Sequence, residues 1–180
     1  MGIVFIGGVH GVGKTSSCVT VSQVMSLPHF TASNLIKSLD SNAVKTHTKS
    51  VASVSKNQDL LVEAAKQILS KSGPRFILDG HFLVPNMLGK FEPVPVDVFR
   101  LLELEGIVFC FDDPIRIYNR RMQRDNKSLS VSEIESIQGL EQRHAEHVAL
   151  SLDLTLFKVN ALDIRTLSSA ISRILNIKLE

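Results

Sequence analysis

The chain has 180 residues, of which 44% are hydrophobic and 21% are charged, and its formal net charge is +2. This length predicts a single domain over residues 1–180 with a full hydrophobic core, and the composition is that of an ordinary globular protein. A net charge so close to zero does not favour a nucleic-acid partner. No apolar run approaches the length of a membrane span.

The cysteines and the N-terminus indicate a cytoplasmic protein without a membrane partner. Cys18 and Cys110 are far apart in the sequence and lack the spacing of metal ligands, so we expect buried, free thiols in a reducing compartment. Residues 1–7 have the pattern of a first strand rather than that of a charged leader followed by a cleavage site.

A phosphate-binding loop follows the first predicted strand. Residues 8–15 read GVHGVGKT and satisfy G-x-x-x-x-G-K-[ST], with the apolar run 3–6 before them and a predicted helix over 16–25 after them. The glycines let successive backbone N–H groups point at one anion, and the N-terminus of the helix adds a favourable dipole. A glycine-rich turn that merely precedes a lysine would not explain both Lys14 and Thr15.

This loop predicts a site for ATP and Mg²⁺. The Lys14 ammonium would contact the β- and γ-phosphates, and the Thr15 hydroxyl would be a ligand of Mg²⁺. We expect the nucleotide to bind to Gly8, Val9, His10, Gly11, Val12, Gly13, Lys14, Thr15 and Ser16.

After the loop, β-rich runs alternate with helical patterns. Strands are predicted over 2–6, 30–32, 75–78, 107–111 and 154–159, and helices over 58–70, 132–150 and 164–174. Ser132 and Glu135 have the spacing of a capping box at the start of the second of these helices. The alternation is typical of an α/β fold in which helices cover both faces of a parallel sheet. Residues 41–56 and 84–96 predict irregular connections, with a lid or binding loop as the alternative to a plain loop.

An acidic residue ends the strand predicted over 75–78. Ligands of open parallel sheets bind beyond the carboxyl ends of the strands, so Asp79 is expected near the phosphates. Its carboxylate would hold Mg²⁺ together with Thr15 or orient an acceptor, whereas the alternative is an aspartate that caps the turn before Gly80. For His81, a substrate contact and an ordinary turn histidine are both open.

A basic helix is predicted after the strand over 107–111, because Asp112-Asp113-Pro114 is typical of a helix start. Three arginines spaced by four residues share one face of this helix: Arg116, Arg120 and Arg124. The opposite face is expected to pack on the core through Ile115, Tyr118 and Met122. Such a stripe is usually solvated, but here it follows a strand end that opens toward the phosphates. We therefore predict that these arginines stabilise the transferring phosphoryl group, with Arg143 reaching the same site from the next helix.

In order and spacing, these motifs resemble the P-loop nucleoside monophosphate kinases, most closely the compact archaeal-type adenylate kinases. The resemblance runs through 8–15, 76–81, 113–125 and 134–145, and so covers most of the chain. It implies a three-layer P-loop fold with a five-stranded parallel sheet, an acceptor-binding flap near 31–57 and a short lid near 120–132. It also implies catalytic positions for Lys14, Asp79, Arg120, Arg124 and Arg143.

The resemblance does not extend to the acceptor residues. Bacterial adenylate kinases have an arginine at the position of Lys37. They have another in the Phe-Pro-Arg that follows Asp-Gly, where this chain reads His81-Phe82-Leu83. Two isolated cysteines also cannot form the cysteine-rich zinc lid of some of these kinases. Donor binding is therefore better supported than the identity of the acceptor.

The leading hypothesis is a kinase that transfers the γ-phosphoryl group of ATP-Mg²⁺ to a nucleoside monophosphate, with AMP as one candidate. One alternative is a kinase of another small hydroxyl or phosphate acceptor. Another is an ATPase switch or a nucleotide-dependent binding module. Small-molecule nucleotides are the expected partners, and the sequence leaves the oligomeric state open.

Overall fold

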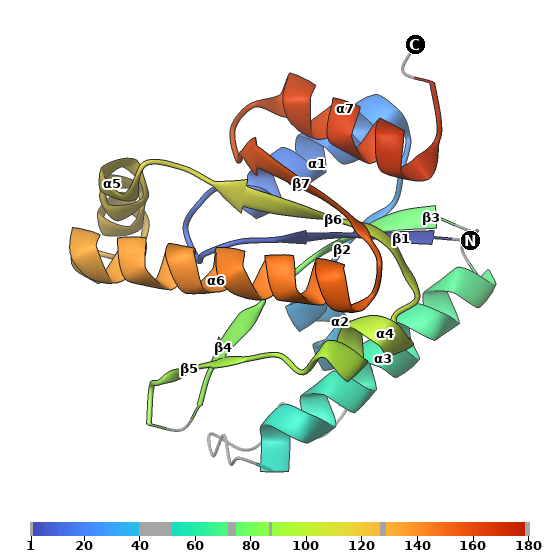
Figure 1. Ribbon diagram of the computed structural model, residues 1–180, viewed down its shortest axis with the longest axis horizontal. Helices are drawn as coiled ribbons and strands as arrows, with labels where there is room; N and C mark the ends of the chain where they lie inside the picture. The colour runs from blue at the N-terminus through green and yellow to red at the C-terminus, as the bar shows by residue number, and fades with distance from the viewer. Residues whose placement is uncertain (1, 40–51, 72–74, 87, 127–128, 179–180) are drawn as a thin grey trace.

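The computed structural model describes residues 2–39, 52–71, 75–86, 88–126 and 129–178. Its middle layer is a five-stranded sheet in the order β2-β3-β1-β6-β7, in which every neighbouring pair is parallel (Figure 1). The strands are β1 (Gly2–Gly7), β2 (His29–Thr31), β3 (Arg75–Asp79), β6 (Leu104–Phe111) and β7 (Thr155–Asn160). The predicted α/β fold class with a five-stranded parallel sheet is confirmed.

The central strand shows why these residues form a covered sheet. All of β1 is buried, and its alternate side chains enter two separate cores. Ile3 and Phe5 belong to one core and Val4 and Ile6 to the other. Because both faces are covered, the strand needs apolar residues at every position and reads as a continuous apolar run.

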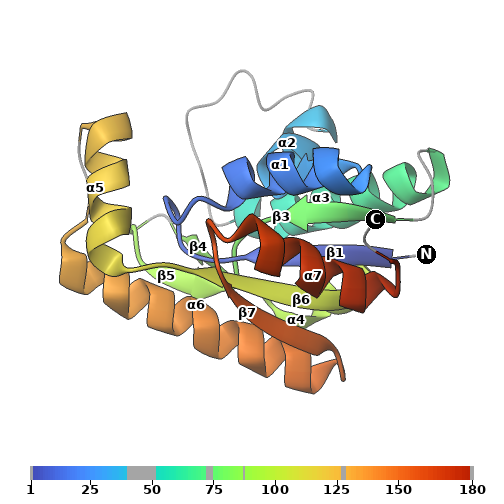
Figure 2. The ribbon, with the colours of Figure 1, turned by 90° about the horizontal axis from the view of Figure 1, so that it is seen from above.

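Helices cover both faces of the sheet, as Figure 2 shows from above. On one face, α1 (Lys14–Met25) packs beside α7 (Ile164–Leu175). On the other face, α3 (Ala52–Lys71) and α6 (Val131–Ser151) pack with the short α4 (Val96–Leu101), while α2 (Ala32–Leu39) packs on α3. Helix α5 (Pro114–Asp125) lies beyond the carboxyl end of β6, where it packs against α6 (Figure 1).

Two segments differ from the sequence prediction. Helix α3 begins at Ala52 rather than at residue 58, and residues 41–51 of the connection predicted over 41–56 lie outside the described residues. The connection predicted over 84–96 contains an antiparallel pair, β4 (Leu83–Pro85) and β5 (Phe91–Pro93). Its prolines obscured the strands in the sequence, although proline is tolerated in a two-stranded pair at edge positions that need no N–H donor.

The capping box of α6 lies two residues earlier than predicted. The Ser130 hydroxyl accepts a hydrogen bond from the amide of Glu133 (3.3 Å), and the Glu133 carboxylate accepts one from the amide of Ser130 (2.8 Å). Both Ser130-x-x-Glu133 and Ser132-x-x-Glu135 have the required spacing, so the sequence alone could not choose between them.

Two further findings concern cysteines and membranes. Cys18 and Cys110 are both buried and free, as expected. Across the described part of the chain, every helix is too short or too polar to cross a membrane.

The two candidate caps give a matched pair of variants. Ser130→Ala removes the observed cap, so we expect it to lower the free energy of unfolding by about 1 kcal/mol. Ser132→Ala should change it by less than about 0.5 kcal/mol, because this exposed serine lies inside the helix. Urea denaturation followed by circular dichroism measures both values, and equal losses would contradict the observed cap.

Candidate active site

A glycine loop connects β1 to α1 at the carboxyl edge of the sheet. Gly8 and Gly13 have positive φ angles of 149° and 109°, which disfavour any other residue. A Cβ atom on Gly8 would overlap the backbone carbonyl oxygen of Cys110 on β6, and one on Gly13 would lie 2.8 Å from Leu162. The loop therefore lies directly against the neighbouring strand and the segment after β7.

Lys14, Thr15 and Asp79 converge at this loop, as the sequence predicted. The Lys14 side chain is only 5% exposed, and its ammonium donates to the Gly8 carbonyl oxygen (2.8 Å). The same Nζ lies 3.9 Å from Oδ1 of Asp79, which ends β3. The Thr15 hydroxyl donates to Oδ2 of Asp79 (2.5 Å). Parallel pairing of β1 with β3 brings these residues together, because it places Ile6 opposite Asp79.

These oxygens fit the chemistry of magnesium. Mg²⁺ prefers hard oxygen ligands and usually binds proteins through one or two of them, with water and substrate phosphates completing its coordination. Thr15 and Asp79 supply such a hydroxyl and carboxylate beside the buried ammonium of Lys14. The group can therefore hold the phosphates of a nucleotide with their metal ion.

Arg120 holds the outer side of the loop. Its Nε donates to the carbonyl oxygen of Gly11 (3.1 Å) and its Nη2 to that of Val12 (3.2 Å). Its Nη2 also lies 2.7 Å from Oδ2 of Asp112 in an ion pair. The sequence predicted that Arg120 contacts the transferring phosphoryl group. In the structure, its guanidinium contacts loop carbonyls and a buried carboxylate.

Asp112 has a structural role that the sequence analysis did not predict, since it was named there only as part of a helix start. It is buried at the end of β6, and its Oδ1 accepts from Asn160 of β7 (3.2 Å) and from the amide of Asp113 (2.8 Å). Burial opposes ionisation of Asp112, but Arg120 and these donors outweigh it and lower the pKa of the carboxyl group. Asp112 therefore stays charged at neutral pH and joins Arg120 to the sheet.

Two more arginines of α5 contact the loop through His10. Nη1 of Arg121 donates to the His10 carbonyl oxygen (3.5 Å), and Nη2 of Arg124 lies 2.9 Å from the His10 ring nitrogen Nε2. Burial, helped by the positive charges nearby, lowers the pKa of His10 to about 4. The ring is therefore neutral at pH 7, and its Nε2 accepts a hydrogen bond from Arg124.

The predicted core face of α5 is confirmed for Tyr118, which packs against the core, but is wrong for Ile115. Ile117 is the fully buried side chain of this helix, whereas Ile115 is 57% exposed. The inner face includes Ile117 together with Arg120 and Arg121, because the helix packs on the glycine loop. A Cβ atom on Gly11 would lie within 4 Å of both Ile117 and Arg121. Helical periodicity permits either face to be the inner one, and only the tertiary partner decides between them.

Two other predicted site residues are exposed. Arg116 is exposed and pairs with Asp112 at 3.7 Å. Arg143 is exposed on α6, and within the described ranges no hydrogen bond or ion pair joins it to the loop. Its contact with the transferring phosphoryl group therefore stays a prediction. In the predicted lid near 120–132, residues 127 and 128 lie outside the described residues.

Glu141 of α6 is a second residue that the sequence analysis missed. Its buried carboxylate accepts from the amide of Phe82 (2.8 Å) and lies 3.5 Å from Nδ1 of His81. It thus anchors the segment that follows Asp79. Helical spacing could have indicated it, because Glu141 falls four residues after Ile137 and four before Ala145, on the buried face of the helix.

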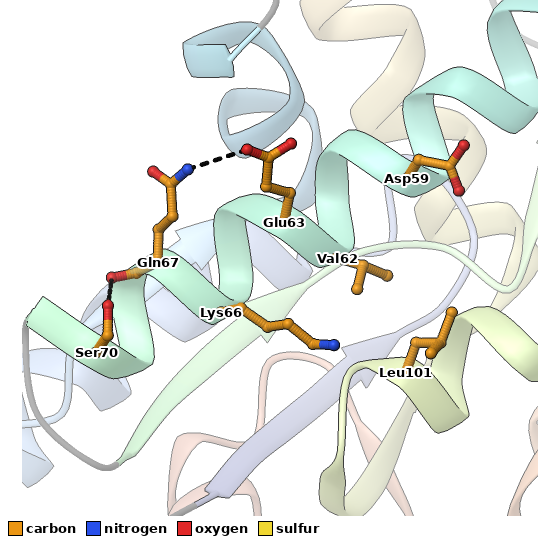
Figure 3. Close-up of a pocket in the computed structure, with 7 residues that line it drawn as sticks. All are labelled: Asp59, Val62, Glu63, Lys66, Gln67, Ser70 and Leu101. Carbon is orange, nitrogen blue, oxygen red and sulfur yellow. Dashed lines mark hydrogen bonds between the residues drawn. The ribbon is translucent and has the colours of Figure 1, made fainter.

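A shallow groove of about 550 Å³ lies elsewhere, between α3 and α4 (Figure 3). It is lined by α3 residues between Asp59 and Ser70 and by Leu101 of α4. In the close-up, the Glu63 and Gln67 side chains bond to each other along the helix, and none of the lining residues belongs to the glycine loop. The groove is therefore separate from the glycine loop.

The fold and the glycine loop define the class of protein as a P-loop nucleotide-binding protein with a covered parallel sheet. A family model described as an AAA domain matches residues 7–138, so the chain belongs to this AAA domain family. No curated protein sequence matches the chain.

Solved kinase structures share the fold over nearly the whole chain. A shikimate kinase from Acinetobacter baumannii in complex with shikimate is 11% identical with a TM-score of 0.62, covering 100% of this chain and 96% of that one. A shikimate kinase from Aquifex aeolicus is 15% identical with a TM-score of 0.56, covering 97% and 96%. A gluconokinase from Sinorhizobium meliloti is 12% identical with a TM-score of 0.54, covering 97% and 94%. At such identities, the likeness shows a common fold.

Arg120 and Arg116 provide a matched test of how the loop is held. Arg120→Ala should lower the free energy of unfolding by about 1–3 kcal/mol, because it leaves the buried Asp112 carboxylate without its main cation. Arg116→Ala breaks only a long, exposed pair and should cost less than about 1 kcal/mol. Urea denaturation measures both, and calorimetry should show weaker ATP binding for Arg120→Ala alone. Similar losses in the two variants would contradict this account of Arg120.

Proposed function

We propose that this protein is an ATP-Mg²⁺-dependent kinase that transfers the γ-phosphoryl group to a small-molecule acceptor. The observation that carries the proposal is the convergence of Lys14, Thr15 and Asp79 at one end of the sheet. A buried ammonium, a hydroxyl and a carboxylate in this arrangement supply the phosphate contact and the metal contact of a P-loop enzyme.

In this mechanism, positioning and electrostatics do most of the catalysis. The loop amides and Lys14 hold the donor phosphates. The positive charge of Lys14 offsets the negative charge that develops on the phosphate oxygens during transfer. Mg²⁺ supplies further charge neutralisation when it is bound to the phosphates. Arg124 is half exposed and hydrogen-bonded to His10 of the loop. Its guanidinium would turn inward from this position to bind a phosphate oxygen. We propose that Asp79 also orients the acceptor.

The acceptor would bind between α2 and the segment after β3. β2 pairs with β3 so that Thr31 lies opposite Asp79, and α2 begins at the next residue. The Thr31 hydroxyl accepts a hydrogen bond from the amide of Asn34 (3.2 Å) and lies 3.3 Å from the hydroxyl of Ser33. These polar groups, with His81 of the segment that follows Asp79, are suited to a hydroxylated acceptor.

A nucleoside monophosphate is the second candidate acceptor. The order of the sequence motifs and the exposed Lys37 in the last turn of α2 favour it. However, arginine forks are the usual partners of a phosphate dianion, and residues 29–39 and 79–86 contain no arginine. The residues around the acceptor position therefore favour a hydroxyl compound.

Acceptor-dependent formation of ADP tests the proposal. ATP-Mg²⁺ is incubated with the protein and, in separate reactions, with nucleoside monophosphates and with hydroxylated acids that include shikimate and gluconate. We expect ADP formation to rise at least tenfold over the acceptor-free control with one chemical class of acceptor. Slow ATP hydrolysis that no acceptor stimulates would contradict the kinase and would favour an ATPase switch.

A further inference from the structure

A second set of potential ligands lies beside the candidate Mg²⁺ site. The thiol of Cys18 on α1, the imidazole of His29 on β2 and the carboxylate of Asp79 on β3 each offer one ligand atom. These three atoms all lie within 4.8 Å of one another. The residues come from three elements that pack together, because β2 pairs with β3 and α1 contacts both.

The three side chains are buried, and one of them lacks a partner. Cys18 is fully buried, and the side chains of His29 and Asp79 are 9% and 5% exposed. Nε2 of His29 is buried without a hydrogen-bond partner, and Oδ2 of Asp79 is 3.9 Å away, too far for a hydrogen bond. Buried polar atoms nearly always have partners, so this nitrogen requires an explanation.

The donor set distinguishes this site from the adjacent oxygen site. Thiolate, imidazole and carboxylate are the ligands of Zn²⁺, and a site with three protein ligands leaves a fourth position open. Mg²⁺ disfavours sulfur and nitrogen, so it would not compete for Cys18 and His29. The two anionic ligands balance the charge of a divalent ion.

We propose that Cys18, His29 and Asp79 bind Zn²⁺ or a similar divalent transition metal, and that this ion inhibits the enzyme. In tetrahedral Zn²⁺ sites, ligand atoms lie roughly 3.5 Å apart, so distances of up to 4.8 Å between the three ligand atoms would need to shorten by at most about 1.3 Å. Burial lowers the pKa of His29, with Asp79 offsetting part of the effect, and the imidazole is therefore neutral as a metal ligand must be. The Cys18 thiol would lose its proton to solvent on binding.

Inhibition follows because Asp79 belongs to both sites. Once the Asp79 carboxylate is bound to the transition-metal ion, it would no longer accept the hydrogen bond from Thr15 or face Lys14. The Mg²⁺ contact that the proposed function assigns to Asp79 would then be lost. The inhibitory effect rests on that proposed function, whereas binding of the metal does not.

Co²⁺ is a suitable spectroscopic probe, because a Co²⁺–thiolate bond gives a strong ultraviolet charge-transfer band. Titration of the full chain with Co²⁺ should produce this band, and Zn²⁺ should abolish it by displacement. Cys18→Ser should lose the band and bind Zn²⁺ at least tenfold more weakly. Cys110→Ser is the matched control, because Cys110 is also a buried free thiol but is outside the cluster, and it should keep the band.

The outcomes separate the two proposals. No band in the wild type, or a band that persists in Cys18→Ser, would overturn the metal site. Circular dichroism checks that each variant folds, and His29→Gln serves as a second variant, which should also lower Zn²⁺ affinity at least tenfold.

With a working acceptor, Zn²⁺ should inhibit wild type and Cys110→Ser but not Cys18→Ser. A Cys18-dependent band in a protein without kinase activity would support the metal site and contradict the proposed function alone.

Discussion

The buried carboxylate of Asp112 is the anchor on which the geometry of the site depends. It holds Arg120 by an ion pair, and Arg120 in turn holds two carbonyl oxygens of the glycine loop. Asp112 also receives a hydrogen bond from Asn160, so the ends of β6 and β7 are tied to the same group. Burying a carboxylate in this way costs free energy unless the carboxylate is fully paired. Loss of any one partner of Asp112 would therefore destabilise all of these contacts.

The loop is thus held from several sides before any ligand binds. The hydroxyl of Ser17 donates to the Ala161 carbonyl oxygen (2.5 Å), which fixes the first turn of α1 to the segment after β7. Glu141 fixes the segment after Asp79 from the opposite face of the sheet. Most of these supporting contacts come from residues other than Lys14, Thr15 and Asp79, to which the proposed function assigns the phosphates and Mg²⁺. Preorganisation of this kind is what phosphoryl transfer requires, because its catalysis consists mainly of fixed charges in fixed positions.

Much of the fold could be predicted from the sequence, because local signals specify it. The apolar runs of β1 and β6 are buried on both faces, and the glycine motif fixes the turn between β1 and α1. The convergence of Lys14, Thr15 and Asp79 was also predictable, since parallel strands place their carboxyl ends at one edge. The rest depends on tertiary partners. Ile115 and Ile117 lie on different faces of one helix, and only the packed loop determines which face is buried.

The roles of the residues that support the loop could not be predicted from the sequence, because these roles also depend on tertiary partners. Arg120 has the spacing of a phosphate-binding arginine, and nothing in the sequence shows that Asp112 lies close enough to pair with it. Cys18, His29 and Asp79 are distant in the sequence and follow no metal-binding motif. Their proximity arises from the pairing of β2 with β3 and from the packing of α1.

The central claim is that the glycine loop, with the buried Lys14, binds the phosphates of ATP-Mg²⁺. Isothermal titration calorimetry of ATP-Mg²⁺ against wild type and Lys14→Ala tests it most directly, with thermal melting to confirm that both proteins are folded. The account predicts that wild type binds and that Lys14→Ala binds at least tenfold more weakly, a loss of about 1.4 kcal/mol or more. Equal affinity in two equally folded proteins would contradict it.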